Sequence, residues 1–352
     1  MSVNVRNIVD QFNIEGSLTE IIPWGNGLMN ATFRVKTTRE DYLLQRMNES
    51  AYPDIPAMID NIQMVTEWIR KSDYYFSDGR KKPTLCLILG KNGGRFIRMP
   101  DGSSWRMYNF MKDTFCIEMV ESYDQAYKLG ETLGRFQYRL HDFPVYQMHV
   151  TVKDFHNPWA HYLKLMKTVG MDPLGRVSEV KEELEFIRRA RRWIEFDFFK
   201  REVESGRIPL RANHNDTKIN NILFDRSSGE SIFMVDLDTL MPGIVAWDFG
   251  DAIRSCMCTG KDRLEGAGTF DRQLYDIYKK GFLDGARGVL TKKEEDTLDK
   301  GAILIVLESA MRYLEDYLNG DTYLKTSYPG QNLVKARMHM KLAEEMMLEL
   351  KK

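Results

Sequence analysis

The sequence predicts an α+β protein with two lobes: a small antiparallel β-sheet lobe at the N-terminal end and a larger, mainly helical lobe after it. Short runs with alternating apolar residues fill the chain up to about Met107, whereas stretches with helical periodicity begin near Asp113. The length of 352 residues also exceeds what one core commonly organises. We therefore expect one lobe over residues 1–108 and a second over residues 109–352.

The first lobe is expected to contain six short strands. Residues 31–37 show the pattern most clearly, because Phe33 and Val35 lie on one face and a polar turn follows at residues 38–41. The expected strands cover residues 18–22, 31–37, 42–47, 85–89, 96–99 and 105–108.

One helix is expected to interrupt these strands. Its apolar residues recur at spacings of 3, 4, 3 and 4, which defines one helical face: Ile55, Met58, Ile62, Val65 and Ile69. Asp54 is a suitable N-cap, and Pro56 is compatible with a first helical turn. The helix should therefore begin at about residue 55.

The second lobe is predicted to be helical, apart from one hairpin near residues 221–236. An apolar stripe runs through residues 126–140. Longer amphipathic helices are expected at residues 176–204, 269–284, 291–318 and 332–350.

The charge balance argues against nucleic acid or a membrane as a partner. Fifty basic and 51 acidic side chains give a net charge of −1. The N-terminus lacks the pattern of a signal peptide, and no apolar run approaches the ~20 residues of a membrane helix. The four cysteines match neither a zinc site nor a disulfide framework. We expect a cytoplasmic protein that is a monomer or a weak dimer.

The segment most informative about chemistry is residues 214–221, which fits the pattern H-x-D-x-K-x-x-N. It leads into an apolar strand at 222–225, a turn at 226–230, and a second strand at 231–235 that ends at Asp236. Pairing of Asp225 with Ser231 would place Asn221 opposite Val235, next to Asp236. Amide and carboxylate oxygens are hard ligands suited to Mg²⁺.

This arrangement predicts phosphoryl transfer from ATP. Asp216 would orient the acceptor hydroxyl and accept its proton, and Lys218 would contact the transferring phosphoryl group. Asn221 and Asp236 would hold Mg²⁺, while His214 would brace the loop. The alternative is a polar loop in which the Asp and Asn residues serve only as turn formers.

Two further aspartates need separate assignments. Asp248 begins the tripeptide Asp-Phe-Gly but lies 27 residues past Asn221, too far for a simple hairpin to return it there. We expect Asp248 to anchor the catalytic loop by hydrogen bonds. Asp238 lies two residues after Asp236 and is expected to assist the metal or bind substrate.

The nucleotide is expected to bind the first lobe. A glycine-containing connection at residues 25–30 precedes an alternating strand rather than a helix, which favours a flap over phosphates and argues against a dinucleotide-binding motif. No P-loop motif occurs. Arg46 is the candidate phosphate-binding cation, with Asp60 or Glu67 as its possible acidic partner. The remaining candidate nucleotide contacts are Gly25, Gly27, Asn30 and Thr32 and, through backbone groups around adenine, Met107 and Asn109.

The motif at 214–225, together with residues 235–254, resembles the aminoglycoside phosphotransferase-like kinases, and the closest similarity is to bacterial N-acetylhexosamine 1-kinases. Residues 25–33 and 44–46 carry further matching phrases, and the similarity runs over nearly the whole chain. The resemblance implies a two-lobed protein-kinase-like fold and transfer of the γ-phosphate of ATP to the anomeric hydroxyl of a small-molecule sugar, GlcNAc or GalNAc. It also implies that Arg312 and Tyr323 contact the sugar.

Alternatives remain open at this point. Arg312 has a structural alternative, an ion pair with Glu308 one turn earlier. His156 and Asn157 match another family phrase, for which we expect a structural role. The enzyme could instead act on another sugar, an aminoglycoside, choline or an amino alcohol. A protein kinase is disfavoured because Asn215 replaces the usual Arg, and a non-catalytic module because Asp216, Asn221 and Asp236 are all present.

Overall fold

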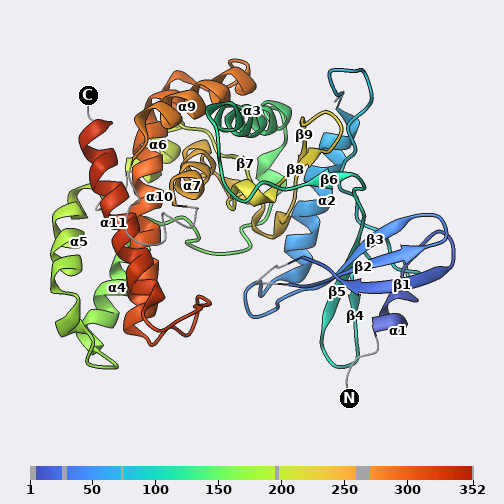
Figure 1. Cartoon of the computed structure of the whole chain (residues 1–352), viewed down its shortest axis with the longest axis horizontal. Helices are drawn as coiled ribbons and strands as arrows, with labels where there is room; N and C mark the ends of the chain where they lie inside the picture. Colours follow the sequence, from blue (N-terminus) through green and yellow to red (C-terminus); the bar gives the residue numbers. More distant parts are fainter. Residues whose placement is uncertain (1–4, 26–29, 73–74, 195–197, 259–269, 351–352) are drawn as a thin grey trace. The chain divides into compact units, whose positions relative to one another are not determined.

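The computed structural model describes residues 5–25, 30–72, 75–194, 198–258 and 270–350 (Figure 1). The chain forms two compact units, each assembled from separate segments. Unit 1 comprises Met1–Cys116, Tyr146–Val152 and Ile222–Met241, and unit 2 comprises Ile117–Val145, Lys153–Asn221 and Pro242–Lys352. The expected lobes over 1–108 and 109–352 remain a prediction, because these units are defined by contacts and not by a single boundary in the chain.

Unit 1 contains a five-stranded sheet in which every neighbouring pair is antiparallel. Its strands, in spatial order, are β1 (Leu18–Pro23), β2 (Ala31–Thr37), β3 (Asp41–Arg46), β5 (Ser104–Asn109) and β4 (Ile97–Arg98). Five of the six expected strands are thereby confirmed, although β4 is shorter than predicted.

The prediction of a strand at residues 85–89 is wrong. Leu87 makes only an isolated bridge with Tyr108. Part of the nearby backbone bonds instead to the side chain of Asn109, which accepts from the Cys86 N–H over 2.7 Å and donates to the Thr84 carbonyl over 3.1 Å. This side chain satisfies groups that a strand ladder would otherwise pair.

One face of this sheet packs against α1 (Val5–Val9), as Figure 1 shows. The shared core includes Ile8, Val35, Leu44 and Met107, each fully buried. Alternation along the strands therefore assigns Phe33, Leu44 and Met107 to the α1 side, and their neighbours in sequence to the opposite face. The face to which a residue belongs becomes important for the candidate site below.

The helix α2 (Ile55–Lys71) begins where the sequence predicts. Asp54 caps it by accepting the Ala57 N–H over 3.0 Å, and Pro56 lies in its first turn. The predicted apolar positions are buried throughout, which confirms the stripe.

A second sheet in unit 1 has the order β6-β8-β9, formed by β6 (Thr114–Phe115), β8 (Ile222–Asp225) and β9 (Ser231–Met234). Ile222 pairs with Met234, as the predicted register requires. The register shifts after Leu223, so that Phe224 and not Asp225 pairs with Ser231. The shift leaves the Asp225 side chain to accept the Ser228 N–H over 2.8 Å and shape the turn.

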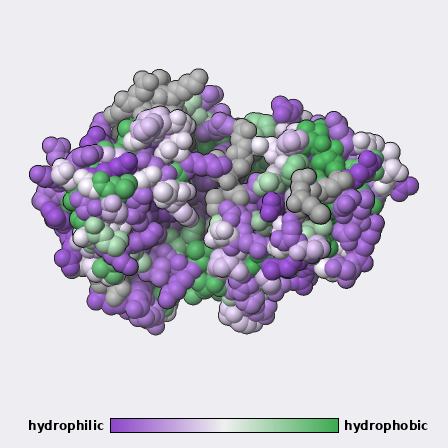
Figure 2. All heavy atoms as spheres, turned by 90° about the horizontal axis from the view of Figure 1, so that it is seen from below, coloured by the Kyte–Doolittle hydropathy of each residue, from purple (hydrophilic) through white to green (hydrophobic). Residues whose placement is uncertain are grey.

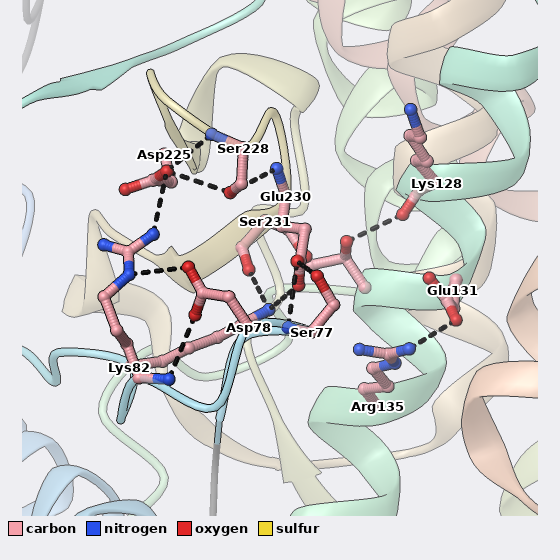
Figure 3. A network of polar contacts seen from close by, with 12 residues as sticks. Ser77, Asp78, Lys82, Lys128, Glu131, Arg135, Asp225, Ser228, Glu230 and Ser231 are labelled. Atoms are coloured by element: carbon pink, nitrogen blue, oxygen red, sulfur yellow. Dashed lines mark hydrogen bonds and ion pairs between the residues drawn. The ribbon is translucent and has the colours of Figure 1, made fainter.

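The turn of this hairpin is tied to residues 77–82 of unit 1 (Figure 3). The Ser77 N–H donates to Glu230 over 3.0 Å, and the ammonium of Lys82 donates to the Ser231 carbonyl over 2.7 Å. Lys82 also lies 3.2 Å from the Glu230 carboxylate. These contacts fix the closed end of the hairpin.

Unit 2 is mainly helical. Its helices are α3 (Tyr123–Arg139), α4 (Pro158–Met171), α5 (Lys181–Ile194), α6 (Phe198–Glu204), α7 (Val245–Cys258), α9 (Arg272–Ala286), α10 (Lys292–Leu318) and α11 (Gln331–Glu349). The remaining described elements are the short strands β7 (Arg211–Asn213) and β10 (Met241–Gly243) and the 3₁₀ turns η1 (Val145–Gln147), η2 (Val177–Glu179), η3 (Ile219–Asn221) and η4 (Leu237–Thr239). Of these, η4 belongs to unit 1, and η1 and β10 each have residues in both units.

The predicted helices at 291–318 and 332–350 are confirmed by α10 and α11, and the stripe at 126–140 by α3. The single helix expected at 176–204 is wrong, because the described part of this stretch divides into η2, α5 and α6. Thr291 begins α10 with a capping box, in which its side chain and that of Glu294 each accept a backbone N–H from the other residue.

Helices α3 and α9 lie side by side (Figure 1) at unusually close range. A Cβ atom added at Gly134 would fall 2.0 Å from the Phe282 carbonyl oxygen, and one at Gly281 would fall 2.2 Å from that of Tyr127. Only residues without a side chain permit backbones to approach this closely.

No helix within the described ranges combines the length and the apolar character needed to cross a membrane. On the face shown in Figure 2, hydrophilic residues predominate and hydrophobic ones form small separate patches.

Candidate active site

The predicted catalytic loop lies in unit 2 between β7 and η3, and α7 holds it. Asp248, on α7, accepts the N–H of His214 over 2.9 Å and that of Asn215 over 2.7 Å. One turn later, Asp251 accepts the Thr217 N–H over 2.8 Å. The prediction that Asp248 anchors this loop is confirmed. Asp251 was missed, because the sequence does not show which face of α7 meets the loop.

Asp216 lies at the centre of the loop with two partners. The Lys218 ammonium is 2.8 Å from Asp216 Oδ2. The amide nitrogen of Asn221 donates to the Asp216 carbonyl over 2.8 Å and to its carboxylate over 3.2 Å. With its nitrogen directed at Asp216, Asn221 retains its amide oxygen as a ligand donor. The carboxylate remains about one-fifth exposed, as a group that must meet a substrate requires.

His214 is fully buried. Its Nδ1 accepts the Asp216 N–H over 3.3 Å, and its ring meets Phe136 edge to face. This geometry fits the predicted role of His214 as a brace for the loop rather than a reacting group.

A buried polar layer supports the loop from α10. The Nε2 atom of His156 lies 3.0 Å from the Asn215 carbonyl oxygen, and its Nδ1 lies 3.2 Å from a carboxylate oxygen of Glu308. Burial acts to lower the pKa of His156, but the Glu308 carboxylate and the other nearby acceptors outweigh it, so the pKa is raised. With both ring nitrogens facing acceptors, the ring is suited to carry both protons.

The two predicted sugar contacts lie in different surroundings in unit 2. Arg312 is 3.8 Å from Glu308, which is the structural alternative considered for it, yet its side chain stays about one-third exposed. Tyr323 is 72% exposed, on a loop that follows α10. Asp316 holds this loop by accepting the N–H of Tyr323 over 2.9 Å and of Leu324 over 2.8 Å.

In unit 1, the residues that follow β9 adopt a constrained conformation. Asp236 has a left-handed backbone, with φ of 62°, and precedes η4. Asp238 is buried and forms an ion pair with Arg106, which is also buried, and accepts the Asn30 side-chain N–H over 2.7 Å. Both Asp238 oxygens thus face unit 1 partners, and the metal or substrate role of Asp238 remains a prediction.

The sheet places Arg46 on the same face as Leu44, the α1 side, next to Trp105. Gln45 lies on the opposite face with Arg106 and with Thr32, whose hydroxyl accepts from Gln45 over 3.2 Å. Arg106 is a basic residue on this second face, together with Arg34 and Lys36 of β2, and the sequence analysis missed it.

Neither candidate acidic partner is shown paired with Arg46. Asp60 forms an ion pair with Arg95, and Glu67 accepts from Gln63. The phosphate contact of Arg46 remains a prediction.

The other expected nucleotide contacts are distributed as follows. Gly25 has a left-handed φ of 73°, as a tight turn requires, whereas Gly27 lies outside the described residues. The Met107 carbonyl accepts the Ile88 N–H over 2.8 Å, and the Asn109 N–H donates to Cys86. The readout of adenine near Met107 and Asn109 remains a prediction, and in the structure these two backbone groups bond to residues 86 and 88.

The two predicted metal ligands have oxygen donors of the type that Mg²⁺ prefers. Asn221 in unit 2 offers an amide oxygen and Asp236 in unit 1 a carboxylate, and Mg²⁺ is usually held by one or two carboxylates together with substrate phosphates and water. Their joint binding of Mg²⁺ remains a prediction. The described residues contain no cluster of three or more His, Cys, Asp or Glu side chains able to hold a metal, and a nucleotide-bound Mg²⁺ does not need one.

Comparison with known proteins identifies the chemistry. The model of the phosphotransferase enzyme family matches residues 20–283. A solved microcompartment-associated aminopropanol kinase is similar over 98% of this chain and 97% of its own, with a TM-score of 0.64 and 15% identity. A choline kinase from Cryptosporidium parvum covers 96% and 92%, with a TM-score of 0.59 and 13% identity. A spectinomycin phosphotransferase covers 94% of both chains, with a TM-score of 0.54 and 12% identity.

Proposed function

We propose that this chain, which belongs to the phosphotransferase enzyme family, transfers the γ-phosphate of ATP to the C1 hydroxyl of an N-acetylhexosamine, GlcNAc or GalNAc. The observation that carries the proposal is the environment of Asp216. A partly exposed carboxylate lies against Lys218 and Asn221, on a loop that buried aspartates of α7 hold in place.

In this proposal Asp216 accepts a hydrogen bond from the C1 hydroxyl and takes its proton as the oxygen attacks phosphorus. Lys218, within reach of Asp216, contacts the phosphoryl oxygens. Asn221 and Asp236 would hold Mg²⁺, which neutralises charge on the phosphates. This pairing is supported by the hairpin, since Asn221 directly precedes Ile222, and Asp236 follows two residues after Met234, the partner of Ile222.

The charge of the predicted acceptor site favours a neutral sugar over a cationic acceptor. Arg312 is a partly exposed cation, and the carboxylate beside it, Glu308, is buried and shared with His156. A cationic acceptor such as choline, an amino alcohol or an aminoglycoside would need acidic groups available to it, in place of the cation Arg312. A neutral sugar needs no acidic group, because Arg312 and Tyr323 can bind its hydroxyl and amide oxygens directly.

The test measures Mg²⁺-dependent ATP consumption with free GlcNAc, GalNAc, glucose, choline, aminopropanol and spectinomycin. We expect turnover with one or both N-acetylhexosamines and an acid-labile sugar 1-phosphate as product. A matched acceptor, the methyl glycoside of the same sugar, has its C1 oxygen blocked and should not react. Turnover confined to choline, aminopropanol or spectinomycin, or equal turnover of the methyl glycoside, would contradict the C1 assignment.

A further inference from the structure

A buried pair of opposite charges lies in unit 1 two residues from the predicted metal ligand Asp236. Arg106, in the middle of β5, and Asp238, in η4, are each 1% exposed in their side chains and form an ion pair. Arg106 also contacts Gln45, since its Nε and Nη2 donate to the Gln45 side-chain oxygen over 3.0 and 2.8 Å. Its guanidinium is therefore fixed in one orientation.

The backbone next to this pair adopts a conformation that needs external support. Asp236 has φ of 62° and ψ of 55°, in the left-handed region that disfavours residues with a side chain. Such conformations persist where the surrounding structure holds them. The following turn, η4, is attached at two points, because Asp238 binds Arg106 and the Leu240 carbonyl accepts the Asn61 side-chain N–H over 2.8 Å.

The same pair reaches the glycine-containing connection before β2. Asn30 donates its side-chain N–H to Asp238 over 2.7 Å and accepts the Asn48 N–H over 3.1 Å. The carboxylate of Asp238 therefore joins three elements of unit 1: the segment after β9, strand β5, and the residue that precedes β2.

Stability alone is a weak reason for this arrangement. Removing two charges from water is costly, and well-packed apolar residues often replace a buried ion pair without loss of stability. A guanidinium that Gln45 holds in place by hydrogen bonds instead provides directional control of the charged group that it contacts.

We propose that the Arg106–Asp238 pair is a positioning device that sets the backbone of Asp236 for metal binding, with Asn30 as a third member of the cluster. The inference rests on one part of the proposed function, the assignment of Asp236 as a metal ligand. It does not depend on which acceptor is phosphorylated. Arg106 and Asp238 act through Asp236 and need not touch the metal.

The test compares Arg106→Lys and Asp238→Asn with the double variant and with Asp236→Ala. Affinity for Mn²⁺, measured by electron paramagnetic resonance in the presence of ADP, is a readout that does not depend on turnover. We expect each single variant to weaken Mn²⁺ affinity about 10- to 100-fold, as is typical when a residue that orients a metal ligand is changed. The double variant should be no weaker than the worse single one, because the two residues act as one unit.

Arg34→Lys is the matched control. Arg34 forms an ion pair with Asp41 in the same sheet, so this change also weakens an Arg–Asp pair of unit 1. It should lower the melting temperature without changing Mn²⁺ affinity.

Unchanged Mn²⁺ affinity in folded Arg106→Lys and Asp238→Asn would overturn the proposal, as would Mn²⁺ binding that Asp236→Ala leaves intact. The sugar assignment fails separately from this proposal. It would be wrong if the unaltered protein bound Mn²⁺ normally but did not phosphorylate either hexosamine.

Discussion

The N–H of Asn215 donates to Oδ1 of Asp248 over 2.7 Å, so that a residue of α7 holds the position next to Asp216. Asn215 has a left-handed backbone, with φ of 62°, and Asn tolerates this region better than most residues. The second oxygen of Asp248 accepts the His214 N–H, and both loop residues are buried. Asp248 thus fixes the direction in which the chain enters Asp216.

Asp248→Asn should weaken this anchor without removing its volume. The amide has one acceptor oxygen, so one buried N–H loses its partner, at a cost of about 1–3 kcal/mol in the free energy of unfolding. We expect kcat to fall while Mn²⁺ affinity stays unchanged. Urea unfolding, steady-state kinetics and Mn²⁺ binding check these outcomes, with the exposed Asp276→Asn as control. A loss of metal affinity at unchanged stability would instead make Asp248 a metal ligand.

The His156–Glu308 pair should stabilise the fold in a limited pH window. The pKa of His156 is raised above 6.5, so its contribution is complete below pH 6.5 and is lost as pH rises through the folded-state value. Burial acts to raise the pKa of Glu308, but His156 and the other neighbouring cations lower it overall, so its contribution is lost in acid as pH falls through the folded value. The window therefore extends from the lowered pKa of Glu308 to the raised pKa of His156.

His156→Gln tests this window. The difference in unfolding free energy between the unaltered protein and the variant should be larger near pH 6 than near pH 9. Besides Glu308, the groups facing His156 are the Asn215 carbonyl and the Asp251 carboxylate, and both favour the charged ring. Chemical denaturation over this pH range, with the exposed His141→Gln as control, provides the comparison. A pH-independent difference would show that folding does not raise the pKa of His156.

The close contact of α3 and α9 predicts a severe effect for one added methyl group. In Gly134→Ala the new Cβ would lie 2.0 Å from the Phe282 carbonyl oxygen, so the helices must separate. We expect a loss of about 1–3 kcal/mol or more in the free energy of unfolding, measured by urea denaturation. The matched change Gly170→Ala in α4, where nothing lies within 4 Å, should be neutral or stabilising by up to about 1 kcal/mol. Equal effects at both sites would contradict close packing.

Arg312→Met separates recognition of the acceptor from a structural role. If Arg312 contacts the sugar, KM for the hexosamine should rise about 10-fold or more, the scale of one lost charged hydrogen bond, while KM for ATP stays unchanged. Initial rates with each substrate varied in turn measure both constants. Arg337→Met is the control, because it removes an ion pair between Arg337 of α11, which is about half exposed, and Glu183 of α5, which is buried. Unaltered hexosamine KM with reduced stability would leave Arg312 only its ion pair with Glu308.

Local patterns predicted those features that depend on neighbours in sequence. The stripe and cap of α2 were evident, because a helix repeats its buried face every three to four residues and Asp54 reaches only as far as Ala57. The Ile222–Met234 register followed from turn length, although the shift after Leu223 did not. The anchoring role of Asp248 followed by exclusion, since no hairpin returns it to Asn221.

Features that depend on contacts between distant segments were decided only by the tertiary structure. Alternation in β3 places Gln45 and Arg46 on opposite faces, but only the packing of α1 against Leu44 shows which face is which. The pairing of Arg106 with Asp238 joins residues that are 132 positions apart. Each of these side chains, taken alone, appears as an ordinary surface charge.

What the sequence determined by itself was β1 to β5, α2 and the β8–β9 hairpin in unit 1 and the helices α3, α9, α10 and α11 in unit 2, together with the loop that carries Asp216. These features follow from the sequence because periodicity, capping and motif spacing act over a few residues. The tertiary structure decided which charged side chains are buried and which groups they contact. Arg106 pairs with Asp238, and Glu308 contacts His156, which in turn contacts the Asn215 carbonyl. The physical reason is that a buried charge is stabilised by its partner, and the partner is set by the packing of elements that are distant in sequence.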